Sequence, residues 1–261
     1  MATDYERGHV PGALHFDSDL LETGYPTWYL KPDAELQGVL ESFGITADTT
    51  VIVYSGWQIA AARGWFALKY AGVEDVRFLD GGYAAWVDAG GAVETTDSLP
   101  VPVDDFGAVV PTHPEYLATT DDVLEHHASG GLVIDVRSWD EYTGEISGYD
   151  YIDAAGRISG AQWGQHCDDT STDYLREDGR LRSPQEIEAI WAGLGADPER
   201  EVVVYCGGGW RSSLAFLYAR LLGYDRVRNY SNGWSEWSTV YGPPPEYAQS
   251  PSGNPVATGV P

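Results

Sequence analysis

The segment that decides the fold is Val202-Val203-Val204-Tyr205-Cys206-Gly207-Gly208-Gly209-Trp210-Arg211-Ser212-Ser213. Its β-branched run predicts a buried strand that ends at Cys206, and its glycines predict a tight loop before a helix that opens near Arg211. The first N–H groups of a helix have no intrahelical partner, and together with the helix dipole and a guanidinium they stabilise a thiolate. The segment therefore predicts a nucleophilic cysteine in an anion-binding loop.

A similar order of residues occurs twice in the chain, with matching segments about 150 residues apart. The run VIVYSG at 51–56 matches VVVYCG at 202–207, and a helical pattern follows each run. Likewise, GHVPGA at 8–13 matches GRISGA at 156–161. Short apolar strands that alternate with helical patterns predict an α/β fold of two tandem domains, each with a parallel sheet flanked by helices.

The composition of the chain changes between these repeats and after them. We expect an inactive first domain at 1–96, a proline-rich linker at 97–114, a catalytic second domain at 115–240 and an irregular tail at 241–261. The second domain has an apolar strand pattern at 132–137 that has no counterpart in the first. A parallel sheet without an interior strand leaves backbone groups unpaired, so we expect the first domain to be N-terminally incomplete.

The charge of the chain excludes some classes of partner. The 261 residues carry 40 acidic and 15 basic side chains, for a formal net charge of −25. Such a field repels nucleic acid and anionic membranes, so neither is expected as a partner. The acidity is typical of a well-solvated surface, and adaptation to high salt is an open alternative. No apolar run approaches the length of a membrane span.

Two cysteines, Cys167 and Cys206, are too few for a disulfide framework, and neither belongs to a zinc-type pair. We therefore expect no metal and no cofactor. The sequence begins without a signal-peptide pattern, so we expect a cytoplasmic protein, or a periplasmic one if an export signal precedes this sequence.

These motifs together resemble the tandem-domain rhodaneses, the thiosulfate sulfurtransferases. The resemblance is greatest to a bacterial subgroup whose active loop reads Cys-Gly-x-Gly-Trp-Arg. The segments that carry it lie in the family's order along nearly the whole chain: Gly8–Ala13, Asp135–Arg137, Cys206–Ser213, Gly233–Trp237 and Asn254–Gly259.

The resemblance implies two rhodanese folds, of which the second is catalytic. In this family the loop cysteine takes up a sulfane sulfur as a persulfide and passes it to a thiophilic acceptor such as cyanide or a thiol. The first repeat has Ser55 where the second has Cys206. A hydroxyl without a base cannot hold a persulfide, so we expect the first domain to be inactive.

We expect the Cys206 thiolate to attack thiosulfate, a small anionic sulfur donor, and Arg211 to neutralise the sulfonate of that donor. Both are therefore predicted catalytic residues. The predicted substrate-binding residues are Gly207, Gly208, Gly209, Trp210, Ser212, Ser213 and Arg182. Of these, Trp210 would shape the pocket mouth or pack the helix start, and the two serines would donate to the persulfide or cap the helix.

Asp135 and Arg137 end the strand that runs beside the active-loop strand in this family, and we predict a supporting ion pair. One departure concerns the segment Glu141–Gly144. Animal rhodaneses place a substrate-binding arginine just before a glycine there, and this chain has none. The anion contact is therefore expected to come mainly from Arg211.

Three alternatives remain open at this point. A Cdc25-like phosphatase or arsenate reductase uses a longer loop than the four residues, 207–210, that separate this cysteine and arginine. A 3-mercaptopyruvate sulfurtransferase resembles Cys-Gly-Ser-Gly-Val-Thr in its loop, without an arginine. A non-catalytic sulfur-carrier module would fit a domain with an altered cysteine, as in the first repeat.

Overall fold

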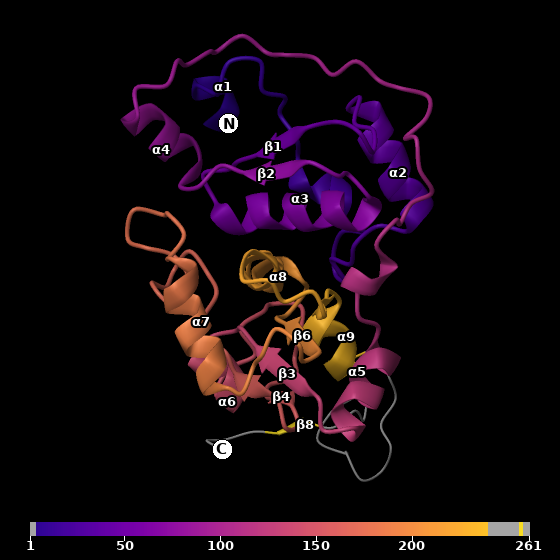
Figure 1. The fold of residues 1–261 in the computed structure, drawn as a ribbon, viewed down its shortest axis with the longest axis vertical. Coiled ribbons are helices and arrows are strands. Elements are labelled where there is room, and N and C mark those ends of the chain that lie inside the picture. The colour runs from indigo at the N-terminus through magenta and orange to yellow at the C-terminus, as the bar shows by residue number, and fades with distance from the viewer. Residues whose placement is uncertain (1–3, 240–255, 258–261) are drawn as a thin grey trace.

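The computed structural model describes residues 4–239 and 256–257, which form two α/β halves (Figure 1). The first half contains α1 (Asp4–Arg7), a short 3-10 helix η1 (Ser18–Leu21), α2 (Asp33–Ser42), β1 (Val51–Val53), α3 (Gln58–Ala71), β2 (Val76–Phe78) and α4 (Gly82–Asp88). The second contains η2 (Pro114–Tyr116), α5 (Thr120–Ala128), β3 (Leu132–Asp135), α6 (Trp139–Thr143), β4 (Arg157–Ile158), β5 (Gln162–Trp163), α7 (Pro184–Gly193), β6 (Val202–Tyr205), α8 (Trp210–Leu221), β7 (Val227–Tyr230), α9 (Gly233–Thr239) and β8 (Val256–Ala257).

The second half is built on four parallel strands in the order β5-β3-β6-β7. Leu132 lies opposite Val202, which in turn lies opposite Val227. Every residue of β3 and β6 is buried, because α7 and α8 pack on one face of the sheet and α5 and α9 on the other. Such two-sided burial explains the continuous β-branched runs. The predicted α/β fold with parallel sheets is confirmed.

The sheet of the first half is smaller. Strands β1 and β2 pair in parallel, and in the described part of the chain no third strand joins them. Ile52 of β1 is 58% exposed, whereas Val203, its counterpart in β6, is fully buried. The incompleteness of the first domain stays a prediction.

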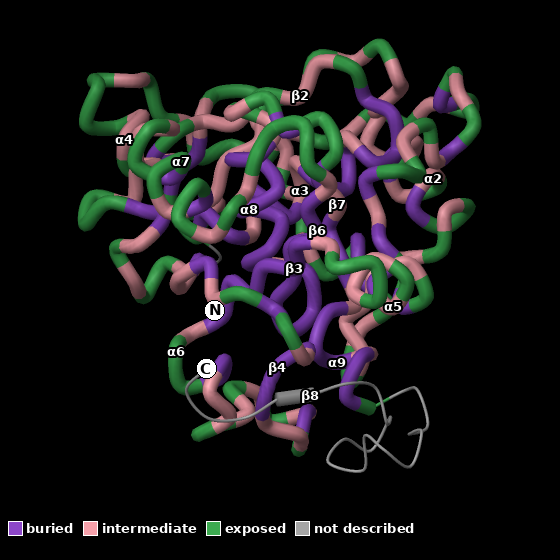
Figure 2. The backbone as a smooth tube through the Cα atoms, turned by 60° about the horizontal axis from the view of Figure 1, so that its bottom comes forward, coloured by how far each residue is buried: buried purple, intermediate pink, exposed green. Residues whose placement is uncertain are grey.

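The two halves share a core where α3 packs against α8 (Figure 1). The rings of Phe66 and Phe216 meet edge-to-face with centroids 5.1 Å apart. Arg63 of α3 is fully buried: its Nε donates to Glu22 at 2.6 Å and its Nη1 donates to Ser231 Oγ of the second half at 2.8 Å. Figure 2 shows the buried backbone gathered around these helices and β6.

Residues 89–113, between α4 and η2, form no helix or strand beyond single bridges of Glu94 with His9 and of Ser98 with Leu14. The predicted linker at 97–114 lies in this stretch except for its last residue, Pro114, which begins η2. The predicted tail falls mostly outside the described residues, but β8 pairs antiparallel with β4, so the tail is not irregular throughout. In the described part of the chain, no helix combines the length and apolar character needed to cross a membrane.

Candidate active site

The predicted nucleophile lies at the end of a buried strand. Cys206 directly follows β6, and α8 begins four residues later. Gly209 caps this helix in the left-handed region, with a φ of 88°, where a glycine is favoured. Gly207 packs so closely against the ring of Tyr149 that a side chain would collide with it. The glycines thus let the loop turn tightly between β6 and α8.

Ser212 places its hydroxyl beside the sulfur. Its Oγ lies 3.6 Å from Cys206 Sγ and 2.7 Å from the amide oxygen of Asn229. Ser213 has a different role, because its Oγ donates to the carbonyl of Gly209 at 2.6 Å and so fixes the first turn of α8. The two serines predicted together as ligands therefore separate into one beside the sulfur and one that braces the loop.

Arg211 is already paired in this structure. Its guanidinium donates to both carboxylate oxygens of Glu141, at 2.7 and 2.8 Å, and to the hydroxyl of Tyr149. Burial alone would raise the pKa of Glu141, but the hydrogen bonds and charge of Arg211 outweigh it and lower this pKa to about 2. Asp168 lies 3.9 Å from Arg211 Nε. Two carboxylates therefore lie near the guanidinium that we predict to bind the sulfonate of the donor, and that role of Arg211 stays a prediction.

Cys206 opens onto a pocket of about 410 Å³ between the two halves, although its own exposure is 1%. The second half supplies Gly148, Tyr149, Tyr151, Asp168, Cys206, Gly208, Trp210 and Arg211. The first half supplies Asp19, Trp28, Trp57 and Ile59. The rings of Trp57 and Trp210 stack at 5.2 Å with an interplanar angle of 25°. Five aromatic side chains and two acids therefore surround the single cation of the lining.

The hydroxyls of this pocket remain protonated at neutral pH. Burial raises the pKa of Tyr149 and of Tyr151 above the usual tyrosine value, and the positive charge of Arg211 offsets this only in part. Both phenols are therefore neutral hydrogen-bond donors next to the sulfur site.

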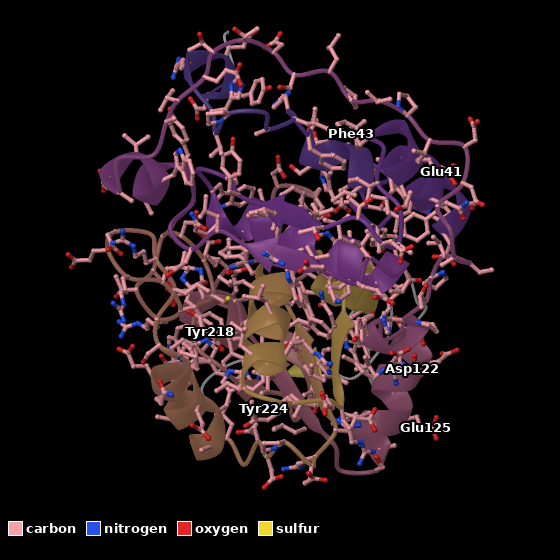
Figure 3. The ribbon with its side chains drawn as sticks, turned by 45° about the horizontal axis from the view of Figure 1, so that its top comes forward. Glu41, Phe43, Asp122, Glu125, Tyr218 and Tyr224 are labelled. Carbon is pink, nitrogen blue, oxygen red and sulfur yellow. The ribbon has the colours of Figure 1, made fainter. Side chains whose placement is uncertain are left out.

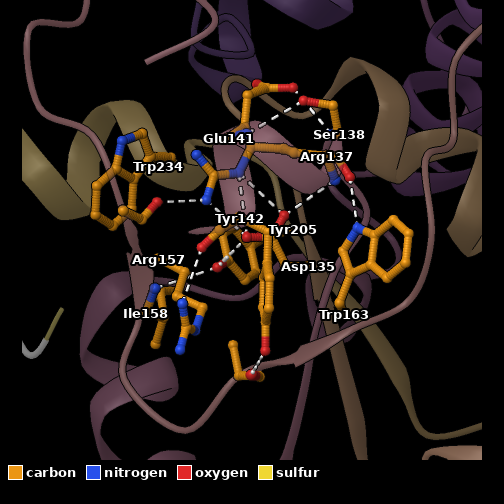
Figure 4. Close-up of polar contacts among 12 residues, drawn as sticks. Asp135, Arg137, Ser138, Glu141, Tyr142, Arg157, Ile158, Trp163, Tyr205 and Trp234 are labelled. Carbon is orange, nitrogen blue, oxygen red and sulfur yellow. Dashed lines mark hydrogen bonds and ion pairs between the residues drawn. The ribbon is translucent and has the colours of Figure 1, made fainter. Parts of the chain in front are cut away.

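Asp135 and Arg137 belong to a network of polar contacts (Figure 4) and do not line the pocket. Arg137 Nη2 is 2.6 Å from Asp135 Oδ2, and the hydroxyl of Tyr205 donates to the same oxygen at 2.6 Å. Arg137 also donates to the carbonyl of Gly156 at 2.7 Å. All three side chains are fully buried, so the pair joins β3 to β6 just before Cys206.

Arg182 does not reach the pocket, and its predicted role as a substrate ligand is not supported by its position. Its Nη1 donates to Glu186 at 3.0 Å, its Nε donates to the carbonyl of Thr172, and a third of the side chain is exposed. Tyr218, labelled in Figure 3, donates to the Arg182 carbonyl at 3.2 Å. The backbone is thus anchored to α8, while the guanidinium is held at the start of α7.

Cys167, the second thiol, is fully buried, and burial raises its pKa well above the usual value. His166, next to it, lies 3.4 Å from Arg211, and burial together with that charge lowers its pKa. Among the described residues, no cluster of three or more metal-ligating side chains occurs.

Sequence reasoning found Cys206, Gly208, Trp210 and Arg211 in the pocket lining and missed its other members. Glu141, the partner of Arg211, does not line the pocket, but the spacing of Ser138 and Glu141 indicates a capping box at the start of α6 and so a fixed position for this carboxylate. The pocket residues of the first half carried no signal, because only the packing of the two halves brings them to Cys206.

Comparison with known proteins identifies relatives over the whole chain. Thiosulfate sulfurtransferase YnjE of Escherichia coli (strain K12) is 41% identical over 98% of this chain and 57% of its own length. The sulfur carrier protein TtuD of Thermus thermophilus is 35% identical over 92% of this chain and 86% of its own length. The chain thus spans little more than half of YnjE.

Solved structures match as well. The crystal structure of YnjE gives a TM-score of 0.88 at 39% identity and covers all of this chain and 61% of that one. The anaerobic ergothioneine biosynthesis enzyme of Chlorobium limicola was solved with its natural substrate trimethyl histidine. It gives a TM-score of 0.88 at 40% identity, and the match covers 98% of this chain and 62% of that one. The model of the rhodanese-like domain matches residues 1–89 and 119–239. This chain belongs to the rhodanese-like sulfurtransferase family, with two domains in tandem.

Proposed function

We propose that this member of the family is a thiosulfate sulfurtransferase with Cys206 as its sulfur acceptor. The observation that carries the proposal is the position of Cys206 Sγ, at the end of β6, beside Ser212 and open to the pocket between the halves. The name of the relative YnjE supports thiosulfate as the donor.

The first half-reaction forms a persulfide. The Cys206 thiolate attacks the outer sulfur of thiosulfate, a new S–S bond forms, the S–S bond of thiosulfate breaks, and sulfite leaves with the bonding pair. The first N–H groups of α8 have no intrahelical acceptor, and its dipole favours negative charge at this end. The hydroxyl of Ser212 can donate to a charged sulfur.

The second half-reaction returns the thiolate. A nucleophilic acceptor attacks the outer sulfur of the persulfide, the S–S bond breaks, and Cys206 keeps the electron pair. With cyanide the product is thiocyanate, and with a thiolate it is a new persulfide. No external oxidant or reductant is required in either half.

The length of the active loop favours a sulfur donor over a phosphate ester as the substrate. Four residues separate Cys206 from Arg211, a shorter loop than a phosphatase of this fold needs around a tetrahedral phosphate. We expect intact mass spectrometry to show one added sulfur atom on the protein after thiosulfate treatment, and none with Cys206→Ser. A parallel assay with 3-mercaptopyruvate and p-nitrophenyl phosphate ranks the alternatives; turnover of the phosphate ester without sulfur uptake would contradict the proposal.

A second candidate concerns the acceptor and rests on the pocket lining. Trp28, Trp57 and Trp210 offer aromatic faces, and Asp19 and Asp168 add negative charge. Such surroundings favour a methylated ammonium group. The Chlorobium limicola enzyme, whose substrate is trimethyl histidine, is similar to this chain. We therefore also propose a cationic acceptor.

A matched series of small thiols tests this candidate. Thiocholine, 2-mercaptoethanol and 2-mercaptoethanesulfonate present a cation, a neutral group and an anion on the same two-carbon thiol. We expect kcat/KM for sulfur transfer from the Cys206 persulfide to fall in that order, after correction for the fraction of thiolate. An equal or reversed order would contradict a cationic acceptor while leaving persulfide formation intact.

A further inference from the structure

The loop of the first half that corresponds to the active loop lies against it in space. With the repeats aligned without a gap, Ser55 matches Cys206, Trp57 matches Gly208 and Ala60 matches Arg211. Strand β1 leads into this loop and α3 begins after it at Gln58, as β6 leads into the active loop and α8 follows. The inactive loop has therefore kept its strand-loop-helix form without the nucleophile and the arginine.

A carboxylate from the second half fills the anion-binding end of this inactive loop. Asp169 Oδ2 accepts a hydrogen bond from the backbone N–H of Gln58 at 3.1 Å, and the N–H of Ile59 donates to the same side chain. These are the first N–H groups of α3, and Trp57 at the cap position gives no side-chain hydrogen bond to them. Asp169 thus caps α3 from across the interface and fixes the position of the loop.

The side chain at the tip of the fixed loop extends into the active pocket. The Trp57 ring stacks on Trp210 at 5.2 Å, lines the pocket that holds Cys206, and is 45% exposed. Its backbone N–H donates to Ser55 Oγ at 3.0 Å. Ser55, the residue that replaced the nucleophile, therefore helps to orient the tryptophan.

We infer that Trp57 is a specificity-determining residue, and that the inactive loop of the first half is the acceptor-binding wall of the active pocket. The inference rests on the proposed function, because it concerns the second half-reaction. An indole face binds an ammonium group by cation–π attraction and by apolar contact. Cyanide carries no group that reaches this wall, so its reaction at the persulfide does not depend on Trp57.

The test compares two acceptors in the full chain and in Trp57→Ala. We expect kcat/KM for thiocholine to fall about tenfold relative to kcat/KM for cyanide in the variant, because cyanide has no group that contacts the indole. Trp86→Ala is the matched control, since Trp86 lies on α4 of the same half and is not part of the pocket lining. It should leave both acceptors unchanged.

A second measurement tests binding at Trp57 without any sulfur transfer. Choline carries the same cation without a thiol, so isothermal titration calorimetry reports its binding even if the protein takes no sulfur from thiosulfate. We expect choline to bind the wild type and to bind Trp57→Ala about tenfold more weakly. Absence of sulfur uptake by the wild type would overturn the proposed function alone.

The inference about Trp57 is overturned by different results. Equal loss toward thiocholine and cyanide in Trp57→Ala would show a general structural role. Unchanged kcat/KM for thiocholine, or choline affinity that does not differ between wild type and variant, would show that the inactive loop binds no acceptor. Asp169→Ala, which removes the cap of α3, should shift the acceptor ratio in the same direction as Trp57→Ala but less.

Discussion

In the second half of this molecule β6 leads into Cys206, and the first turn of α8 lies beside the sulfur of that same loop. In the first half β1 leads to Ser55, and the corresponding end of α3 is satisfied by Asp169, a carboxylate from the other half. The comparison teaches that a strand-loop-helix unit supplies a place for negative charge and no chemistry of its own. On the function proposed above, the residue that brings the negative charge decides whether such a loop transfers sulfur or helps to line the pocket.

The strongest test of this comparison exchanges the two loop residues. Cys206→Ser should abolish persulfide formation, because a hydroxyl without a base is a poor nucleophile. Adding Ser55→Cys to that variant should not restore it, because Asp169 already occupies the start of α3 and Ala60 stands where the second half has Arg211. Intact mass spectrometry after thiosulfate treatment measures the sulfur added to each variant. Sulfur uptake by the double variant would contradict the difference drawn between the two loops.

The ion pair of Arg211 with Glu141 exists only around the second loop, and it should matter for stability. Glu141→Gln leaves a buried guanidinium without its bidentate partner and should lower the free energy of unfolding by about 3 kcal/mol at pH 7. Because the pKa of Glu141 lies at about 2 in the folded state, this stabilisation is complete above the unfolded value near 4.5 and is lost as the pH falls toward 2.

Urea denaturation at pH 7 and at pH 3 measures this difference, which should be smaller at pH 3. Glu186→Gln is the matched control. Its partner Arg182 forms a solvent-exposed pair with it, so the loss of stability should be much smaller than in Glu141→Gln. An equal loss in both variants would show that the buried pair at the active loop stabilises the fold no more than the exposed pair does.

Ser212 sharpens the contrast at the level of the sulfur, because its counterpart in the first repeat is Ala61. Ser212→Ala removes the hydroxyl that lies 3.6 Å from Cys206 Sγ and should lower kcat/KM for thiosulfate by about tenfold to a hundredfold. Ser213→Ala is the control, since its hydroxyl binds the Gly209 carbonyl; it should cost about 1 kcal/mol of stability and little activity. If Ser213→Ala lowered kcat/KM and Ser212→Ala did not, Ser213 and not Ser212 would be the hydroxyl that acts on the sulfur.

Asp169 gives the first loop a pH response of its own. Burial raises the pKa of Asp169 to about 6, the N–H of Gln58 opposes this, and the charge of Asp168 adds to it. A folded pKa above the unfolded value means that stability is lost as the pH rises through 6. The melting temperature of Asp169→Asn, measured relative to that of the wild type, should therefore rise between pH 4 and pH 7. A difference that does not change with pH would contradict this assignment.

The smallest effect is expected at Arg182. Because its guanidinium is held by Glu186 and Thr172, Arg182→Ala should leave kcat/KM for thiosulfate within about twofold of the wild type. A loss of tenfold or more in the same assay would show that Arg182 contributes to substrate binding although it does not line the pocket.

The sequence was sufficient where local rules govern structure. The β-branched run before Cys206, the glycine loop and the repeat predicted β6, α8 and their counterparts, since strand and helix patterns are local. The pairing of Arg211 with Glu141 and the reach of Trp57 to Trp210 depend on segments far apart in the chain. Arg182 was predicted as an anion ligand from its charge, although its i,i+4 spacing to Glu186 already favoured the pair that the structure shows.

The buried Arg63 has a consequence for any attempt to use the catalytic half by itself. Its guanidinium fills the space under Gly209 and donates to Ser231, while its carboxylate partner Glu22 comes from the first half. A shortened protein would expose this underside of the loop to water and would lose the cation that braces it. Covalent linkage keeps both halves at high effective concentration, so the first half is a lasting part of the scaffold around Cys206.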